Sequence, residues 1–171
     1  GPMAKEHWVR PPDYERFFKK EVPEDPAARR AYARELLGDF AGRAFRRPVD
    51  EATVNRLIGL AESISSQPDK TFEAGIAQAM VAVLASPRFL FREERPEAAP
   101  NGKTFPYVDE YSLASRLSYF LWSSMPDEEL FRLAASGQLR KSLSGQVERM
   151  FKDKRAEALI KDFGGQWLHT R

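Results

Sequence analysis

Residues 109–130 read DEYSLASRLSYFLWSSMPDEEL, and this stretch decides the fold class. Apolar side chains recur three or four residues apart over residues 110–123, which predicts an amphipathic helix after the N-cap residue Asp109. Pro126 ends this helix, and acidic residues 127–129 place negative charge in the first turn of the next one, where the helix dipole favours it. The expected core stripe of the first helix contains Leu113, Leu117, Phe120 and Leu121, widened by Tyr111, Tyr119 and Trp122.

The same helical spacing continues through the rest of the chain. Capping and helix-breaking residues mark the ends of further helices, which we expect at residues 26–46, 51–65, 72–85, 87–91, 127–136, 143–151 and 154–163. No segment alternates apolar and polar residues in the manner of a strand. The predicted fold class is therefore all-α, with seven to eight short-to-medium helices in one bundle or in two small packed helical modules.

Proline and glycine indicate where the chain divides. Residues 95–108 have few apolar side chains and contain Pro96, Pro100, Asn101, Gly102 and Pro106, so this segment is the expected linker. It separates a first helical module at residues 25–94 from a second at 109–171, which we expect to be C-terminally truncated. Residues 1–24 are expected to hold a protease-cleavage scar, Gly-Pro-Met, and an N-terminal arm.

Composition excludes several function classes. The chain has 27 basic and 25 acidic residues, and this balance argues against a nucleic-acid-binding face. It contains no cysteine, which excludes disulfides, thiolate metal sites and covalent attachment of haem c to this chain, and its two histidines, His7 and His169, stand far apart. No apolar run reaches the roughly 18 residues of a membrane span. We expect no cofactor, metal site or catalytic residue within these residues.

Two helices invite predictions about packing. Gly38 and Gly42 lie four residues apart in the helix expected at 26–46, where each costs about 0.5–1 kcal/mol relative to alanine. This spacing predicts that another helix closely approaches them. The helix expected at 72–85 is apolar around most of its circumference, which places it at the centre of the first module.

Two groups of side chains are candidate binding sites. Arg43, Arg46 and Arg47 lie at a helix C-terminus, where cations meet the dipole favourably; an anion-binding site is the alternative. The second group, a candidate ligand pocket, contains Arg116, Trp122, Trp167 and His169. Core packing of the tryptophans and solvation of the histidine are the simpler interpretation. The acidic residues 127–129 are interpreted as helix-start charges, because consecutive helical side chains do not converge on one point.

Specific strings resemble known domains. Residues 41–49, AGRAFRRPV, and 85–92, ASPRFLFR, resemble one small domain of unknown function. Residues 111–130, together with FGGQWL at 163–168, resemble the domain that usually follows it. Both resemble parts of large secreted planctomycete-type proteins that also carry a c-type cytochrome-like domain, and the resemblance extends over residues 27–171.

The resemblance implies a non-catalytic helical scaffold or interaction module of a larger extracytoplasmic, cytochrome c-associated protein. It implies a periplasmic or extracellular location, although no signal peptide is expected within these residues, and it puts haem c in another segment of the parent protein. The expected partners are other domains of that protein or a separate protein, with oligomerisation left open. The alternative is part of an oxidoreductase active site, or a ligand pocket completed by other segments, lined by Arg116, Trp122 and Trp167.

Overall fold

The structure is a computed structural model that describes residues 12–98 and 105–165. Helices dominate this part of the chain, and the all-α fold class is confirmed. The strands of the described residues form one short antiparallel ribbon, in which Pro96 pairs with Val108 and Glu97 with Tyr107. This ribbon falls within the expected linker, where proline and glycine favour a turn over a helix.

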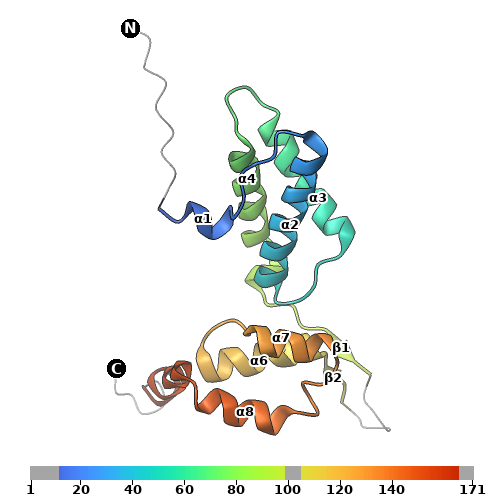
Figure 1. Cartoon of the computed structure of the whole chain (residues 1–171). Helices are drawn as coiled ribbons and strands as arrows, with labels where there is room; N and C mark the ends of the chain where they lie inside the picture. Colours follow the sequence, from blue (N-terminus) through green and yellow to red (C-terminus); the bar gives the residue numbers. More distant parts are fainter. Residues whose placement is uncertain (1–11, 99–104, 166–171) are drawn as a thin grey trace. The chain divides into compact units, whose positions relative to one another are not determined.

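The chain divides into two compact units. Unit 1 comprises Gly1–Ala41 and Val49–Leu84, and unit 2 comprises Gly42–Pro48 and Ala85–Arg171. The elements of unit 1 are α1 (Tyr14–Phe17), α2 (Pro26–Phe45, whose last turn belongs to unit 2), α3 (Glu51–Ser65) and α4 (Phe72–Leu84) (Figure 1). Those of unit 2 are α5 (Pro87–Leu90), β1 (Pro96–Glu97), β2 (Tyr107–Val108), α6 (Glu110–Trp122), α7 (Glu128–Ala135), α8 (Leu143–Phe151), η2 (Lys154–Ala156), α9 (Glu157–Leu159) and η3 (Ile160–Gly164).

In unit 1, α3 and α4 pack closely at a glycine. A Cβ atom added to Gly75 of α4 would lie 2.3 Å from the backbone oxygen of Ala61 in α3, so only glycine fits there. The predicted close approach at Gly38 and Gly42 is wrong: an added Cβ at Gly38 meets no described atom within 4 Å, and at Gly42 it meets only the Arg47 carbonyl oxygen at 3.8 Å.

The apolar circumference of α4 predicted a helix surrounded on all sides, and this prediction is wrong. Ile76, Ala79 and Val83 are buried on one face, whereas Val81 on another face is 55% exposed. The aromatic ring of Phe72, at the start of α4, stacks on Tyr32 of α2 with 6.0 Å between ring centroids. Helix α4 therefore closes one side of the unit 1 core.

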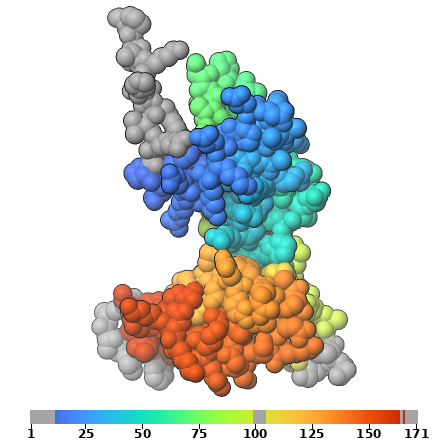
Figure 2. All heavy atoms as spheres, in the orientation of Figure 1, coloured from blue at the N-terminus to red at the C-terminus, as the bar shows by residue number. Residues whose placement is uncertain are grey.

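The core of unit 2 forms around Trp122. The indole Nε1 donates a hydrogen bond to the Met150 carbonyl oxygen at 3.0 Å, which joins α6 to α8. Arg155 covers the indole, with its guanidinium carbon 3.5 Å from the ring centroid. The remaining buried members of this core are Ala114, Leu121, Leu130, Leu133, Ala134, Leu139 and Met150. Helices α7 and α8 form one continuous surface over it (Figure 2).

Helix α6 buries most of the predicted stripe. Leu121 and Trp122 are core residues, and Tyr111, Leu113 and Leu117 pack against the core. The prediction is wrong for Phe120, and it left out two small residues. Phe120 is 62% exposed, while Ala114 and Ser118 are fully buried. Small side chains allow neighbouring elements to approach α6 closely, so they occupy the core face. The buried Ser118 hydroxyl donates a hydrogen bond to the Ser115 carbonyl oxygen at 3.1 Å. A pattern built on large apolar residues finds Leu121 and Trp122 but misses Ala114 and Ser118.

Most predicted helix ends are confirmed. Asp50, Asp109 and Asp127 each accept a hydrogen bond from the backbone N–H three residues later, at 2.7–3.0 Å. Helix α7 is followed by Gly137 at φ 64°, with the bonding of a glycine-terminated helix. The single α-helix expected over residues 154–163 is instead a succession of 3₁₀, α and π turns.

Candidate functional site: an arginine-rich cleft in unit 2

A cleft of about 770 Å³ opens on unit 2 between the end of α2, the segment after α5 and one face of α6. Helix α6 contributes Ser112, Ser115, Arg116 and Tyr119, which share a face because they are three and four residues apart. The other lining residues are Phe45, Arg46, Arg47, Phe91, Arg92, Glu93, Glu94 and Phe120. We call this feature the arginine cleft.

The turn that ends α2 delivers two arginines to the arginine cleft. The Arg47 N–H donates to the Gly42 carbonyl at 3.1 Å and the Arg46 N–H to the Arg43 carbonyl at 3.2 Å, the bonding pattern of a Schellman motif. Arg46 takes the left-handed position, φ 58°, that glycine usually occupies. Arg46 and Arg47 are both buried, whereas the Arg43 side chain is 71% exposed and lies 3.8 Å from Glu128. The structure thus brings together two of the three arginines in the predicted cluster.

Arg47 is neutralised by Asp109, the N-cap residue of α6. The guanidinium donates to both carboxylate oxygens, at 2.8 and 3.3 Å, and to Ser112 Oγ at 3.1 Å. Burial of Asp109 would raise its pKa, but the hydrogen bonds from Arg47 and Ser112 outweigh this effect and hold the pKa below its ordinary value. Arg47 therefore joins the α2 turn to the start of α6 as a structural ion pair.

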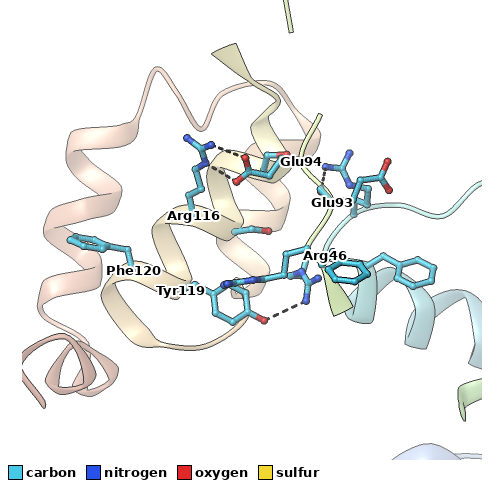
Figure 3. A pocket seen from close by; sticks show the side chains of 12 residues that line it. Arg46, Glu93, Glu94, Arg116, Tyr119 and Phe120 are labelled. Carbon is cyan, nitrogen blue, oxygen red and sulfur yellow. Dashed lines mark hydrogen bonds and ion pairs between the residues drawn. The ribbon is translucent and has the colours of Figure 1, made fainter. Parts of the chain in front are cut away.

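Arg116 is neutralised by Glu94. Its Nε donates to Oε1 at 2.7 Å and its Nη2 to Oε2 at 2.6 Å, a two-point pair visible in Figure 3. The hydrogen bond from Arg116 lowers the pKa of Glu94, against a smaller opposing effect of burial. A carboxylate held ionised in this way is a poor general acid.

Arg46 is buried without a carboxylate. Its guanidinium donates to the carbonyl oxygens of Phe89, at 3.0 Å, and Arg88, at 3.4 Å, and to the Tyr119 hydroxyl at 3.5 Å. Figure 3 shows Arg46 and Tyr119 directed toward each other. Within residues 12–98 and 105–165, no acidic side chain contacts Arg46, although it is only 5% exposed. Buried charges are normally paired, so this environment leaves a positive charge uncompensated.

Arg92 adds a second positive charge, which is exposed to solvent and helps Arg116 to lower the pKa of Glu94. Its guanidinium carbon lies 4.7 Å from the Tyr119 ring centroid, and no described carboxylate forms an ion pair with it. Glu93, the remaining acid of the arginine cleft, lies 3.7 Å from Arg88 and 3.9 Å from Arg95 instead. Like Arg46, Arg92 has a positive φ, 48°, which is uncommon for residues other than glycine.

The second predicted group does not come together as far as the structure describes it. Arg116 lines the arginine cleft, whereas Trp122 is 3% exposed in the core of unit 2. Trp167 and His169 lie outside the described residues, so their part in a pocket stays a prediction. Sequence reasoning missed Arg92 and Glu94 and assigned Tyr119 to the core. The run FREE at residues 91–94 was the available signal.

The comparisons with known proteins divide the chain in two. Residues 32–94 match a family model described as PSD5, a protein of unknown function (DUF1595). Residues 108–171 match one described as PSD4, a protein of unknown function (DUF1592). The chain is similar to paired domains of unknown function. No curated protein and no solved structure matches it.

The arginine cleft draws on both matched segments. Arg46 and residues 91–94 come from the first, and the α6 face comes from the second. Across the part of the chain that the structure describes, no three histidine or acidic side chains are grouped to hold a metal ion. In the same part, no helix combines the length and the apolar character needed to cross a bilayer.

Proposed function

We propose that this chain is a non-catalytic helical scaffold and interaction module of a larger extracytoplasmic, cytochrome c-associated protein, and that the arginine cleft is its interaction site. The observation that carries this proposal is the pairing inside the cleft. Asp109, next to the cleft, and Glu94, in its wall, are each bound by an arginine that lowers the pKa of the carboxyl. Glu93, the other acid of the cleft, lies 3.7 Å from Arg88 and 3.9 Å from Arg95. What the cleft presents instead is cationic and aromatic surface.

Such a surface suits protein recognition. Arginine and aromatic side chains are enriched at protein interfaces and among the residues that dominate binding energy. Phe91 is 79% and Phe120 62% exposed at the arginine cleft, so each offers apolar area to a partner without contributing to the core. The tandem match to two domains of unknown function and the resemblance to secreted multidomain proteins support a place within a longer chain.

The same proposal covers compartment, cofactor and partners. We place the module in the periplasm or outside the cell, in contact with other domains of the parent protein or with a separate protein, and not with nucleic acid. The chain has no cysteine, so its residues do not fit covalent attachment of haem c. Any haem c of the parent protein therefore lies in another segment.

Sedimentation velocity tests the interaction. The remaining domains of the parent protein, produced separately, should bind this chain, and Phe91→Ser or Phe120→Ser should weaken the association at least tenfold. Phe151→Ser is the matched control, because Phe151 is also exposed on unit 2, at 55%, but lies outside the arginine cleft. The control should bind as the unmodified chain does.

Two results would contradict the proposal. Absence of association, or an equal loss in the Phe151→Ser control, would remove the arginine cleft as the interaction site. Turnover of a redox or glycan substrate by the chain, abolished by Arg116→Gln in a protein of unchanged circular dichroism, would show that the module is catalytic.

A further inference from the structure

We propose that the arginine cleft binds an acidic side chain of a partner protein segment, flanked by apolar residues, with Arg46 and Arg92 as the counter-charges. This inference rests on the proposed function, because it names what the interaction site recognises.

The charge of the cleft is the first argument. Four arginines and two glutamates line it, and Asp109 neutralises Arg47 from beneath. Glu94 is engaged with Arg116, and Glu93 lies near Arg88 and Arg95. Among the described residues no carboxylate forms an ion pair with Arg46 or Arg92, although the charge of Arg92 interacts with Glu94, which Arg116 binds. The guanidinium carbons of Arg46 and Arg92 lie 5.8 and 4.7 Å from the Tyr119 ring centroid. A buried guanidinium gains most from an anion, because water screens the attraction least there.

The hydrogen-bonding capacity of Arg46 favours a carboxylate. A guanidinium has five N–H groups, and Arg46 already donates to two carbonyls and one hydroxyl. Both Nη2 hydrogens and one Nη1 hydrogen are thus used, which leaves Nε–H and one Nη1–H on different edges of the guanidinium. Either one can donate a charge-assisted hydrogen bond to a carboxylate oxygen.

Size and surface indicate that the carboxylate is carried on an apolar body. The cleft volume of about 770 Å³ lies inside the roughly 300–1,000 Å³ range of sites that enclose organic ligands. The exposed rings of Phe91 and Phe120 provide apolar contact area beside the charges. A peptide that places apolar side chains next to an acidic one matches both features.

The backbone supplies an independent sign. Four non-glycine residues of the described part have positive φ, and two of them are Arg46 and Arg92. Residues held in sparsely populated backbone conformations gather at binding and catalytic sites, where the required side-chain direction offsets the cost. Two of these four left-handed residues are therefore arginines of the cleft that form no ion pair.

The test compares two peptides that differ in one charge. N-acetyl-Phe-Asp-Phe-amide and N-acetyl-Phe-Asn-Phe-amide are titrated into the ¹⁵N-labelled chain, and affinity is read from amide chemical shifts. The aspartate peptide should bind at least tenfold tighter than the asparagine peptide, with shifts centred on residues 91–94 and the α6 face. Inorganic phosphate is the third ligand and should bind more weakly than the aspartate peptide.

Variants assign the charges. Arg92→Gln should lower the affinity for the aspartate peptide at least tenfold. The Arg92 side chain is exposed, so its replacement should leave the fold intact. Lys152→Gln removes the same charge from unit 2 outside the arginine cleft and should change affinity less than twofold. Arg46→Gln should act as Arg92→Gln does, provided that its circular dichroism is unchanged.

The outcomes separate this inference from the proposed function. Equal affinity for the two peptides, an equal effect of Lys152→Gln, or tighter binding of phosphate would overturn the inference. If the remaining domains of the parent protein bind while the aspartate peptide does not, the inference fails and the proposed function stands. If the peptide binds through Arg92 and those domains do not associate, the proposed function fails and the inference stands.

Discussion

Asp109→Asn should destabilise unit 2 strongly, because it leaves Arg47 buried without its counter-charge. The Arg47 side chain is 7% exposed and that of Asp109 15%. Breaking a buried ion pair by removing one partner costs about 3 kcal/mol or more, since the remaining charge stays desolvated. Asparagine still caps a helix as well as aspartate does, so the capping hydrogen bond from Ser112 N–H is retained. The expected loss is therefore electrostatic, about 3 kcal/mol.

Asp109→Ala separates the two roles of this side chain. It removes the charge and also the cap of α6, which adds about 1 kcal/mol to the loss. The matched control is Asp127→Asn in the same unit, because Asp127 caps α7 and pairs with Arg149 at 2.8 Å in the same manner. The Arg149 side chain is 35% exposed, so water can solvate it after the change. The control should cost only about 1 kcal/mol.

Urea denaturation followed by Trp122 fluorescence measures these changes. Trp122 lies in the core of unit 2, and replacing Trp8 and Trp167 with phenylalanine leaves it as the single reporter among the three tryptophans. A loss for Asp109→Asn no larger than that for Asp127→Asn would refute the reasoning, because burial of the cation would then not decide the cost. An unchanged midpoint for Asp109→Asn would refute the ion pair itself.

Three further predictions concern stability. Gly75→Ala should cost about 1–3 kcal/mol in thermal unfolding, since the new Cβ would meet the backbone of α3 at 2.3 Å, whereas Gly59→Ala, with open space at its Cβ, should stabilise by about 0.5–1 kcal/mol. Acid should unfold unit 2: burial raises the pKa of Asp109 and Asp127, but their arginine bonds hold both below the ordinary 3.8, so the stability they contribute is present above pH 4 and is lost as the pH falls through the lowered values. Asp109→Asn should flatten this pH dependence in urea titrations. Trp122→Phe should cost about 1–3 kcal/mol in urea denaturation followed by far-UV circular dichroism, because it leaves a buried carbonyl of α8 without its donor.

The helices were predictable because their signals are local. Asp50, Asp109 and Asp127 mark N-caps through contacts three residues away, and Pro126 and Gly137 act on their immediate neighbours. Each of these interactions joins residues within one helical turn, so the local sequence is enough to predict it.

The arginine cleft was only partly predictable because its contacts are remote in sequence. Arg47 meets Asp109 across 62 residues, and Arg46 meets Tyr119 across 73. A cluster of arginines at a helix end has the same appearance whether it is solvated or buried, and only the tertiary fold decides. The prediction that Phe120 lies in the core was wrong for a related reason. Helical spacing gives the period of an apolar stripe, but it does not show how far around the helix the neighbouring elements cover it.

The turn after α2 has a consequence for how this position changes over generations. The comparable turn after α7 is closed by Gly137, which holds its left-handed conformation at no steric cost. A mutation of residue 46 to glycine should relieve roughly 1 kcal/mol of backbone strain. A lineage that keeps arginine at this position therefore keeps its side chain although the backbone conformation favours glycine. Comparison of residue 46 with residue 137 across related sequences would measure how strong that retention is.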